Sequence, residues 1–173
     1  YWMNLPGVTN TDAVQVREVK VENDRVYLYT VPYHADMRAM GGPLLEMYIS
    51  SPQPDIIRTE AYHFMGSNQK MPAFELNDAH CALEVENTET TVTIKSGNTK
   101  LVIGKNPCSF DYYYKDKKLT SIGNRFGNAM ISTVSTPDGN YMRAQMNLDI
   151  GEKVYGLGER FTPYVKNGQT VET

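Results

Sequence analysis

The fold class is decided by the stretch Thr91-Val92-Thr93-Ile94-Lys95-Ser96-Gly97-Asn98-Thr99-Lys100-Leu101-Val102-Ile103. β-Branched residues alternate with polar ones over 91–95, which is the period-two pattern of a β-strand, and a second strand-like run follows over 100–103. Between the two runs, Ser96-Gly97-Asn98 supplies residues that tolerate the positive φ of a tight reversal. The stretch therefore predicts a β-hairpin.

The same alternating, strand-like pattern recurs along much of the chain. We expect further strands in the runs 14–16, 19–21, 26–31, 45–49, 56–64, 82–86 and 109–114. Turn-forming residues lie at 22–24, 86–88 and 137–140, and 66–72 is predicted to be a surface loop. Because no stretch has convincing helical periodicity, the sequence predicts an all-β, antiparallel β-sandwich.

Length and composition limit the size and kind of domain. The 173 residues suit one domain, whereas a complete (β/α)8 barrel needs about 250 residues. A hydrophobic content of 40% and an aromatic content of 10% are typical of a folded domain. A single domain spanning 1–173 is the expectation.

Charge, hydropathy and cysteine content limit the possible binding partners and the cellular setting of the chain. A net charge of −3 with interspersed signs predicts no nucleic-acid partner, and no apolar run approaches the roughly 20 residues of a membrane span. The start of the chain lacks the pattern of a signal peptide. Two cysteines, Cys81 and Cys108, are too few for a disulfide framework, so we expect a reduced, cytoplasmic setting.

The chain carries a second informative run near its end, Val154-Tyr155-Gly156-Leu157-Gly158-Glu159-Arg160-Phe161-Thr162-Pro163. It reads as a strand that leads into two closely spaced glycines. Phe161 stands where a dinucleotide-binding fingerprint needs its third glycine, and no βαβ unit surrounds the run, so no cofactor is expected. We predict a structural or domain-interface motif in which the glycines allow a bend or a close approach; its residues are Tyr155, Gly156, Gly158, Glu159, Arg160 and Phe161.

The rest of the sequence offers only weak candidates for catalytic or ligand-binding residues. Neither catalytic nor metal-binding residues are predicted, because the three histidines are widely separated; they are His34, His63 and His80. Glu84 and Glu86 share one strand face and are expected to line its solvent side. The run Tyr112-Tyr113-Tyr114 is compatible with stacking on sugar rings, but packing in a strand is favoured, with Tyr113 opposite its neighbours.

The terminal run, together with the tail Val165-Lys166-Asn167-Gly168-Gln169-Thr170-Val171-Glu172-Thr173, resembles the end of the N-terminal β-sandwich of glycoside hydrolase family 31, most closely in the α-xylosidases. The resemblance implies a galactose mutarotase-like supersandwich. It further implies a parent enzyme that hydrolyses terminal α-xylosidic, or α-glucosidic, bonds with retention. The family's two catalytic aspartates lie on a (β/α)8 barrel, which this chain lacks, so the domain would support the barrel and shape the rim of its pocket for an α-xylosyl saccharide.

The chain is shorter than the family's whole sandwich, which implies that the final strands are missing. Unpaired strand edges favour association, so we expect a homo-oligomer. Two alternatives stay open. One is a stand-alone carbohydrate-binding module, and the other is a mutarotase-like enzyme that would need a paired histidine and glutamate.

Overall fold

The computed structural model describes residues 5–32, 44–63, 80–123, 131–159 and 161–171. Within these ranges the chain forms strands and no helix, and this part of the chain therefore contains no helix long and apolar enough to cross a membrane. The strands are β1 (Thr9–Asp12), β2 (Gln15–Val21), β3 (Arg25–Val31), β4 (Leu45–Ser50), β5 (Arg58–Tyr62), β6 (Glu84–Asn87), β7 (Thr91–Ser96), β8 (Thr99–Lys105), β9 (Cys108–Tyr114), β10 (Lys117–Ile122), β11 (Ile131–Thr136) and β12 (Gly139–Ala144). The predicted all-β class is confirmed.

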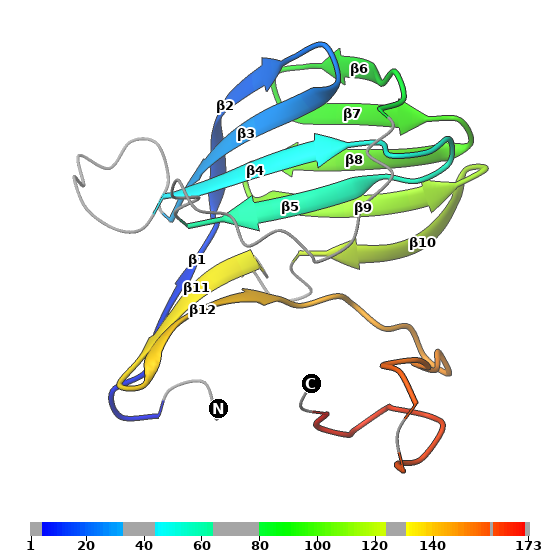
Figure 1. Ribbon diagram of the computed structural model, residues 1–173. Helices are drawn as coiled ribbons and strands as arrows, with labels where there is room; N and C mark the ends of the chain where they lie inside the picture. Colours follow the sequence, from blue (N-terminus) through cyan, green and yellow to red (C-terminus); the bar gives the residue numbers. More distant parts are fainter. Residues whose placement is uncertain (1–4, 33–43, 64–79, 124–130, 160, 172–173) are drawn as a thin grey trace.

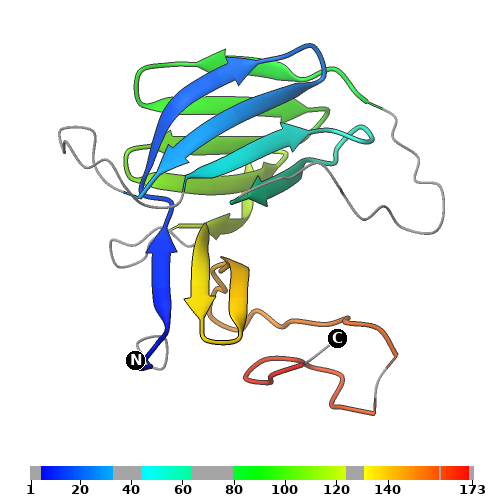
Figure 2. The ribbon, with the colours of Figure 1, turned by 60° about the vertical axis from the view of Figure 1, so that its left-hand side comes forward.

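The strands form three antiparallel sheets. A four-stranded sheet has the order β2-β3-β4-β5, and a five-stranded sheet has the order β10-β9-β8-β7-β6. Figure 1 shows these two sheets stacked face to face, with the four-stranded sheet in front. The third sheet, β1-β11-β12, lies below the sandwich, and Figure 2 shows the chain continuing from it as an extended tail.

One hydrophobic core fills the space between the two larger sheets, because alternate residues of their strands point inward. Its fully buried side chains come from both sheets; they include Val26, Leu28, Met47 and Ile49 on one side and Val92, Ile94, Leu101, Ile103 and Phe110 on the other. The alternation that predicted these strands therefore also identifies the core.

The predicted reversals are confirmed at three places. Gly97 has a φ of +56° in the β7–β8 turn, where Ser96 pairs with Thr99. The amide of Glu22 donates to the Arg25 carbonyl at 2.8 Å between β2 and β3. The predicted turn at 137–140 connects β11 to β12.

Some expectations on individual elements are wrong. The runs 14–16 and 19–21 belong to one strand, β2, whose pairing register shifts at a bulge between Val16 and Glu18. Among the described residues of the run 56–64, the strand covers Arg58–Tyr62, and residue 64 lies outside the described part. Strands β1, β10, β11 and β12 were not predicted, because their residues lack a clean alternation. The predicted loop at 66–72, like His34, lies outside the described residues.

Candidate functional site

The last part of the described chain forms a closed loop, which we call the C-terminal loop, residues 152–169. Its two ends are joined by three hydrogen bonds. The Lys166 amide donates to the Val154 carbonyl at 2.8 Å, and the Val154 amide donates to Asn167 Oδ1 at 2.8 Å. Asn167 Nδ2 then donates to the Glu152 carbonyl at 3.0 Å. The polar tail residues therefore hold the loop together.

The predicted strand before the two glycines is wrong, since no described residue from 147 onward belongs to a strand. The backbone instead bends sharply. Gly156, Leu157 and Gly158 have φ values of 105°, 68° and 79°, which lie in the region that favours glycine. A Cβ placed on either glycine would meet no described atom within 4 Å. The glycines thus serve a bend, and no close approach of another described element accounts for them.

The C-terminal loop exposes several large apolar side chains. Phe161 is 113% exposed and Tyr164 is 81% exposed, and about half of Tyr155 and of Leu157 is exposed. The rings of Tyr155 and Tyr164 contact each other at a centroid distance of 5.1 Å. Large apolar side chains that gather on a protein surface are common at interaction sites. The predicted motif residues therefore include an exposed aromatic surface; Glu159 is also exposed, and Arg160 lies outside the described residues.

One lysine stiffens this loop from inside. Lys166 is buried, and its Nζ donates to Thr162 Oγ1 at 2.5 Å and to the Pro163 carbonyl at 2.8 Å. A buried ammonium group has to be hydrogen-bonded, because its desolvation is otherwise costly. Lys166 consequently fixes the segment that presents Phe161 and Tyr164.

A second apolar feature lies where the sandwich is open. We call it the β5–β10 groove; it lies between β5 of one sheet and β9, β10 and β12, has a volume of about 690 Å³, and is lined among others by Ile57, Tyr112, Leu119, Ile122, Met142 and Met146. Leu119, Met142 and Met146 are 51%, 42% and 57% exposed. Inside it, the Thr59 hydroxyl lies 3.0 Å from the Tyr112 hydroxyl and joins the two sheets. The groove is an incompletely covered part of the core.

The side chains of the three consecutive tyrosines on β9 point to alternate faces of the sheet, as predicted. Tyr112 packs against the core, and Tyr112 and Tyr114 both line the β5–β10 groove. Tyr113 points to the opposite face, where Lys100 Nζ lies 5.0 Å from its ring centroid. The run therefore forms no continuous platform for a sugar.

The carboxylates and histidines that were considered as candidates for catalysis or metal binding do not form one site. Glu84 and Glu86 are exposed on β6, as expected for a solvent-facing side. His80 Nδ1 lies 3.6 Å from Asp24 Oδ2 at the surface. His63 lines a separate pocket, and no described carboxylate lines that pocket with it. Among the described residues, no three His, Cys, Asp or Glu side chains lie close enough to hold a metal ion.

Both cysteines are free thiols. Cys108 is buried, and burial raises the pKa of its thiol to about 12. Its nucleophilic thiolate is therefore disfavoured at neutral pH. Cys81 is half-buried, and its amide donates to the Ser51 carbonyl at 2.8 Å. Cys108 is thus a small side chain that packs in the core.

The described chain is thus an antiparallel sandwich with an exposed C-terminal loop and an apolar groove between its sheets. The family comparison agrees: residues 46–173 match the model of the glycosyl hydrolase 31 N-terminal galactose mutarotase-like domain. The chain belongs to this family, which confirms the resemblance read from its sequence.

Two curated relatives match nearly the whole chain. It is 32% identical over 180 residues to the α-xylosidase XylQ of Lactiplantibacillus pentosus, a match that covers 100% of this chain and 23% of the relative. It is 28% identical to an α-xylosidase of Emericella nidulans, with 98% of this chain and 24% of the relative covered. The chain thus spans about a quarter of the length of these relatives and corresponds to a part of larger family 31 enzymes.

Solved structures share the fold. A cycloalternan-forming enzyme of Listeria monocytogenes, in complex with a pentasaccharide substrate, superposes with a TM-score of 0.70 at 19% identity over 94% of this chain and 14% of that chain. A family 31 dextranase of Flavobacterium johnsoniae gives a TM-score of 0.65 at 14% identity, over 92% of this chain and 18% of that one. At these identities the likeness concerns the fold alone.

Proposed function

We propose that this chain is the non-catalytic N-terminal domain of a retaining glycoside hydrolase that acts on terminal α-xylosidic, or α-glucosidic, bonds. In this proposal the chemistry takes place on a (β/α)8 barrel elsewhere in the parent polypeptide. The domain supports that barrel, and the C-terminal loop shapes the rim of the pocket that receives an α-xylosyl saccharide. The whole of 1–173 acts as one incomplete sandwich domain.

The observation that carries the proposal is the exposed aromatic surface of the C-terminal loop. Phe161 and Tyr164 are held outward on a loop that is stiffened by buried Lys166. Rigid exposed aromatic residues are typical anchors of an interface, because they bury much apolar area at little entropic cost. Similarity to two α-xylosidases supports the barrel as the partner that covers them.

The β5–β10 groove supports a second contact with the rest of the parent. Its exposed apolar side chains include Leu119 and Met146, and β5 and β10 are edge strands of their sheets. Edge strands present unpaired backbone groups that accept further strands. We propose that later strands of the parent cover this groove, and that the isolated chain uses it to form a homo-oligomer.

The other two function classes receive less support. A mutarotase-like activity needs a histidine and a glutamate around one sugar pocket, and the described residues of the pocket that holds His63 include no carboxylate. The free thiols of Cys81 and Cys108 support the proposed reduced, cytoplasmic setting. A carbohydrate-binding role is compatible with a supporting domain.

The proposal is tested by complementation in trans. The part of the parent that follows residue 173 is produced alone and mixed with this chain, and hydrolysis of a chromogenic α-xyloside is measured. We expect the mixture to be more active than either part. A chain that carries Phe161→Ser and Tyr164→Ser should restore less activity, whereas Val21→Ser, a change at an exposed apolar residue on β2, is the matched control. Equal activity with and without this chain would refute a supporting role.

A further inference from the structure

We propose that the outer face of the four-stranded sheet β2-β3-β4-β5 is a binding surface for a neutral oligosaccharide. This face is the side of the sheet that points away from the core. The proposal goes beyond the supporting role described above and does not depend on it, because binding to this face requires no barrel.

The residues of this face are tyrosines and charged side chains that lie in register across the strands. In one row, Lys20 on β2 pairs with Tyr27, Tyr27 with Tyr48, and Tyr48 with Glu60. The parallel row contains Glu18, Tyr29, Glu46 and Tyr62 in the same strand order. Directly opposite residues of antiparallel strands lie on the same face of a sheet. The face therefore carries four tyrosines on three neighbouring strands.

Three of these rings lie next to one another across β3, β4 and β5 and form what we call the aromatic row, Tyr27, Tyr48 and Tyr62. The centroids of Tyr27 and Tyr48 are 5.4 Å apart, and those of Tyr48 and Tyr62 are 6.1 Å apart. Their interplanar angles are 54° and 67°, so the surface is ridged rather than flat. Tyrosine offers an apolar ring and a polar tip, which matches the apolar C–H faces and the hydroxyls of a pyranose. A ridged row suits a curved oligosaccharide better than a flat crystalline one.

Hydrogen bonds hold two of the rings in place. Tyr27 donates to Glu46 Oε1 at 3.0 Å, and Tyr62 donates to Glu60 Oε1 at 3.0 Å. Burial, together with the hydrogen bond to the carboxylate, raises the pKa of Tyr27 and of Tyr62, so both hydroxyls stay protonated. These rings are ordered before any ligand arrives, which lowers the entropic cost of binding.

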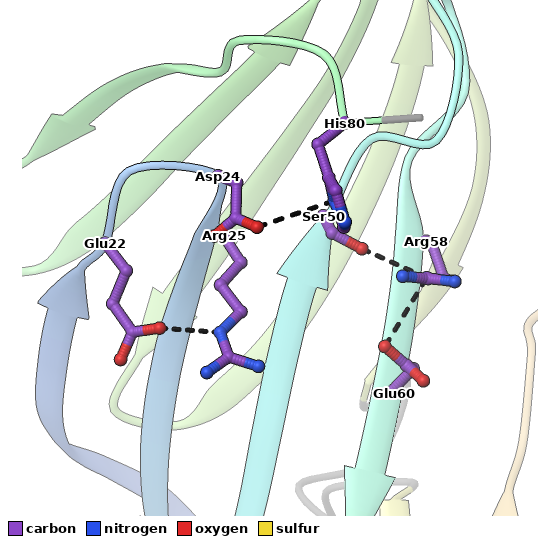
Figure 3. Close-up of polar contacts among 7 residues, drawn as sticks. All are labelled: Glu22, Asp24, Arg25, Ser50, Arg58, Glu60 and His80. Carbon is purple, nitrogen blue, oxygen red and sulfur yellow. Dashed lines mark hydrogen bonds and ion pairs between the residues drawn. The ribbon is translucent and has the colours of Figure 1, made fainter. Parts of the chain in front are cut away.

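Charged groups on the same face supply donors and acceptors, and Figure 3 shows the contacts of Arg25 and Arg58. Arg58 Nε donates to Ser50 Oγ at 3.0 Å and lies 3.4 Å from Glu60 Oε2. Arg25 Nε donates to Glu22 Oε2 at 2.6 Å, and its guanidinium carbon lies 4.7 Å from the Tyr48 ring centroid. A guanidinium group has five N–H donors, so Arg25 has further donors for ligand hydroxyls.

The chemistry of this face favours a saccharide over other ligands. Positive and negative side chains are interspersed, as in Lys20 beside Glu18 and Arg25 beside Glu22, so no field attracts a polyanion. A protein partner would have to desolvate these charges, which are depleted in the cores of protein interfaces. A saccharide hydroxyl both donates and accepts hydrogen bonds. A neutral oligosaccharide therefore pairs with carboxylates and guanidinium groups while its C–H faces contact the rings.

The five-stranded sheet provides an internal comparison. Its outer face carries the row Glu84, Lys95, Lys100, Tyr113 and Lys118, in register. Tyr113 lies there among lysines and has no described tyrosine beside it in the row. A tyrosine of that face is the matched control for one of the aromatic row.

The test uses the 173-residue chain and two neutral probes, isomaltotriose and a xyloglucan heptasaccharide. Isothermal titration calorimetry measures the affinity, and saturation-transfer NMR shows which sugar protons contact the protein. We expect saturable binding of at least one probe. Tyr48→Ala should weaken it at least tenfold, Tyr48→Phe should stay within threefold of the original affinity, and Tyr113→Ala should leave it unchanged.

Circular dichroism establishes that each variant is folded. If Tyr48→Ala is unfolded, Tyr62→Ala on edge strand β5 replaces it with the same expectation. Absence of binding for both probes would overturn the proposal, and so would an equal loss of affinity in Tyr113→Ala. Because no hydrolysis is measured, a failure here is distinct from a failure of complementation by the parent's remaining part.

Discussion

The hydroxyl oxygens of Ser51 and Ser96 lie 2.7 Å apart at a buried position and connect the two large sheets across 45 residues of sequence. Ser51 Oγ also donates to the Gln53 carbonyl at 2.8 Å. Since a hydroxyl has one proton, Ser96 is the donor in the contact between the two serines. The end of β4 and the end of β7 are thereby fixed to each other.

This contact predicts unequal effects of the two alanine variants. Ser51→Ala removes both hydrogen bonds and leaves the buried Ser96 hydroxyl without its acceptor, so we expect a loss of about 1–3 kcal/mol in the free energy of unfolding. Ser96→Ala should cost less, because Ser51 keeps its bond to Gln53. Urea denaturation of both single variants and the double variant measures the coupling. Strictly additive losses would contradict the assigned contact.

Asp55 and the β7–β8 turn form a second connection between the sheets. Its carboxylate accepts from the Asn98 amide, and its carbonyl accepts from Thr99 Oγ1 at 2.6 Å. A Cβ on Gly97 would collide with Asp55 Oδ1, and Gly97 has a φ of +56°. Gly97→Ala is expected to lower the free energy of unfolding by about 1–3 kcal/mol.

A double variant separates the two causes. In an Asp55→Gly background the collision with the carboxylate is absent, and the positive φ and a 3.2 Å contact with the backbone nitrogen of residue 55 remain, so Gly97→Ala should cost less than in the unaltered chain. The same cost in both backgrounds, measured by thermal denaturation, would argue against the collision.

Stability at high pH should depend on Cys108. Burial raises the pKa of its thiol from 9.0 to about 12, so the unfolded chain releases this proton at a lower pH than the folded chain does. The unfolded state then binds fewer protons, and stability falls as pH rises from about 9 toward about 12. The expected slope from this group is up to about 1.4 kcal/mol per pH unit.

The measurement compares the chain with Cys108→Ala by urea denaturation on either side of pH 9, where the thiol of the unfolded chain, with its ordinary pKa of 9.0, loses its proton. The two conditions are about pH 8 and about pH 10, and each pH unit corresponds to about 1.4 kcal/mol of proton linkage. The variant should be less stable at pH 8 but should lose less stability on going to pH 10. Tyr27, Tyr62 and Tyr112 have pKa values raised in the same sense, and their effect begins above their usual value of 10.0. Identical slopes in both proteins would contradict the assignment to Cys108.

The β5–β10 groove should drive association of the isolated chain. Leu119 and Met142 are exposed at its rim, and light scattering at high protein concentration is expected to give a mass above that of the 19.5 kDa monomer. Leu119→Lys and Met142→Lys together should shift the mass toward the monomer. Val21→Lys, at an exposed residue of β2, is the control. A monomeric mass for the unaltered chain would show that the groove does not self-associate.

The sequence predicts the sandwich well where alternation is strong. In β3, Val26 and Leu28 are buried while Tyr27 and Tyr29 lie on the other face, as a period of two requires. The β7–β8 hairpin was predicted for the same reason, with Gly97 in its turn. Local pattern and turn chemistry suffice for such elements.

The remaining elements depend on pairing over long distances. Strand β1 consists of Thr9, Asn10, Thr11 and Asp12, which carry no apolar alternation, and it exists because it pairs with β11 more than 100 residues away. The expected strand at Val154 fails because its amide bonds to an asparagine side chain rather than to a strand. Sequence periodicity contains neither kind of information.

The sites show the same limit. The glycines at 156 and 158 and the aromatic residues beside them were recognisable as a motif, but the buried position of Lys166 was not. The aromatic row of Tyr27, Tyr48 and Tyr62 could not be predicted either. Each tyrosine was visible on its own strand, whereas their proximity depends on the register of three strands.

The central claim is that this domain supports a hydrolase whose chemistry lies elsewhere. The most direct measurement compares this chain with the parent polypeptide extended through its barrel, using a chromogenic α-xyloside and a chromogenic α-glucoside. We predict hydrolysis by the extended protein only, with the xyloside preferred. Turnover by the 173-residue chain itself would contradict the account and assign the chemistry to its own carboxylates.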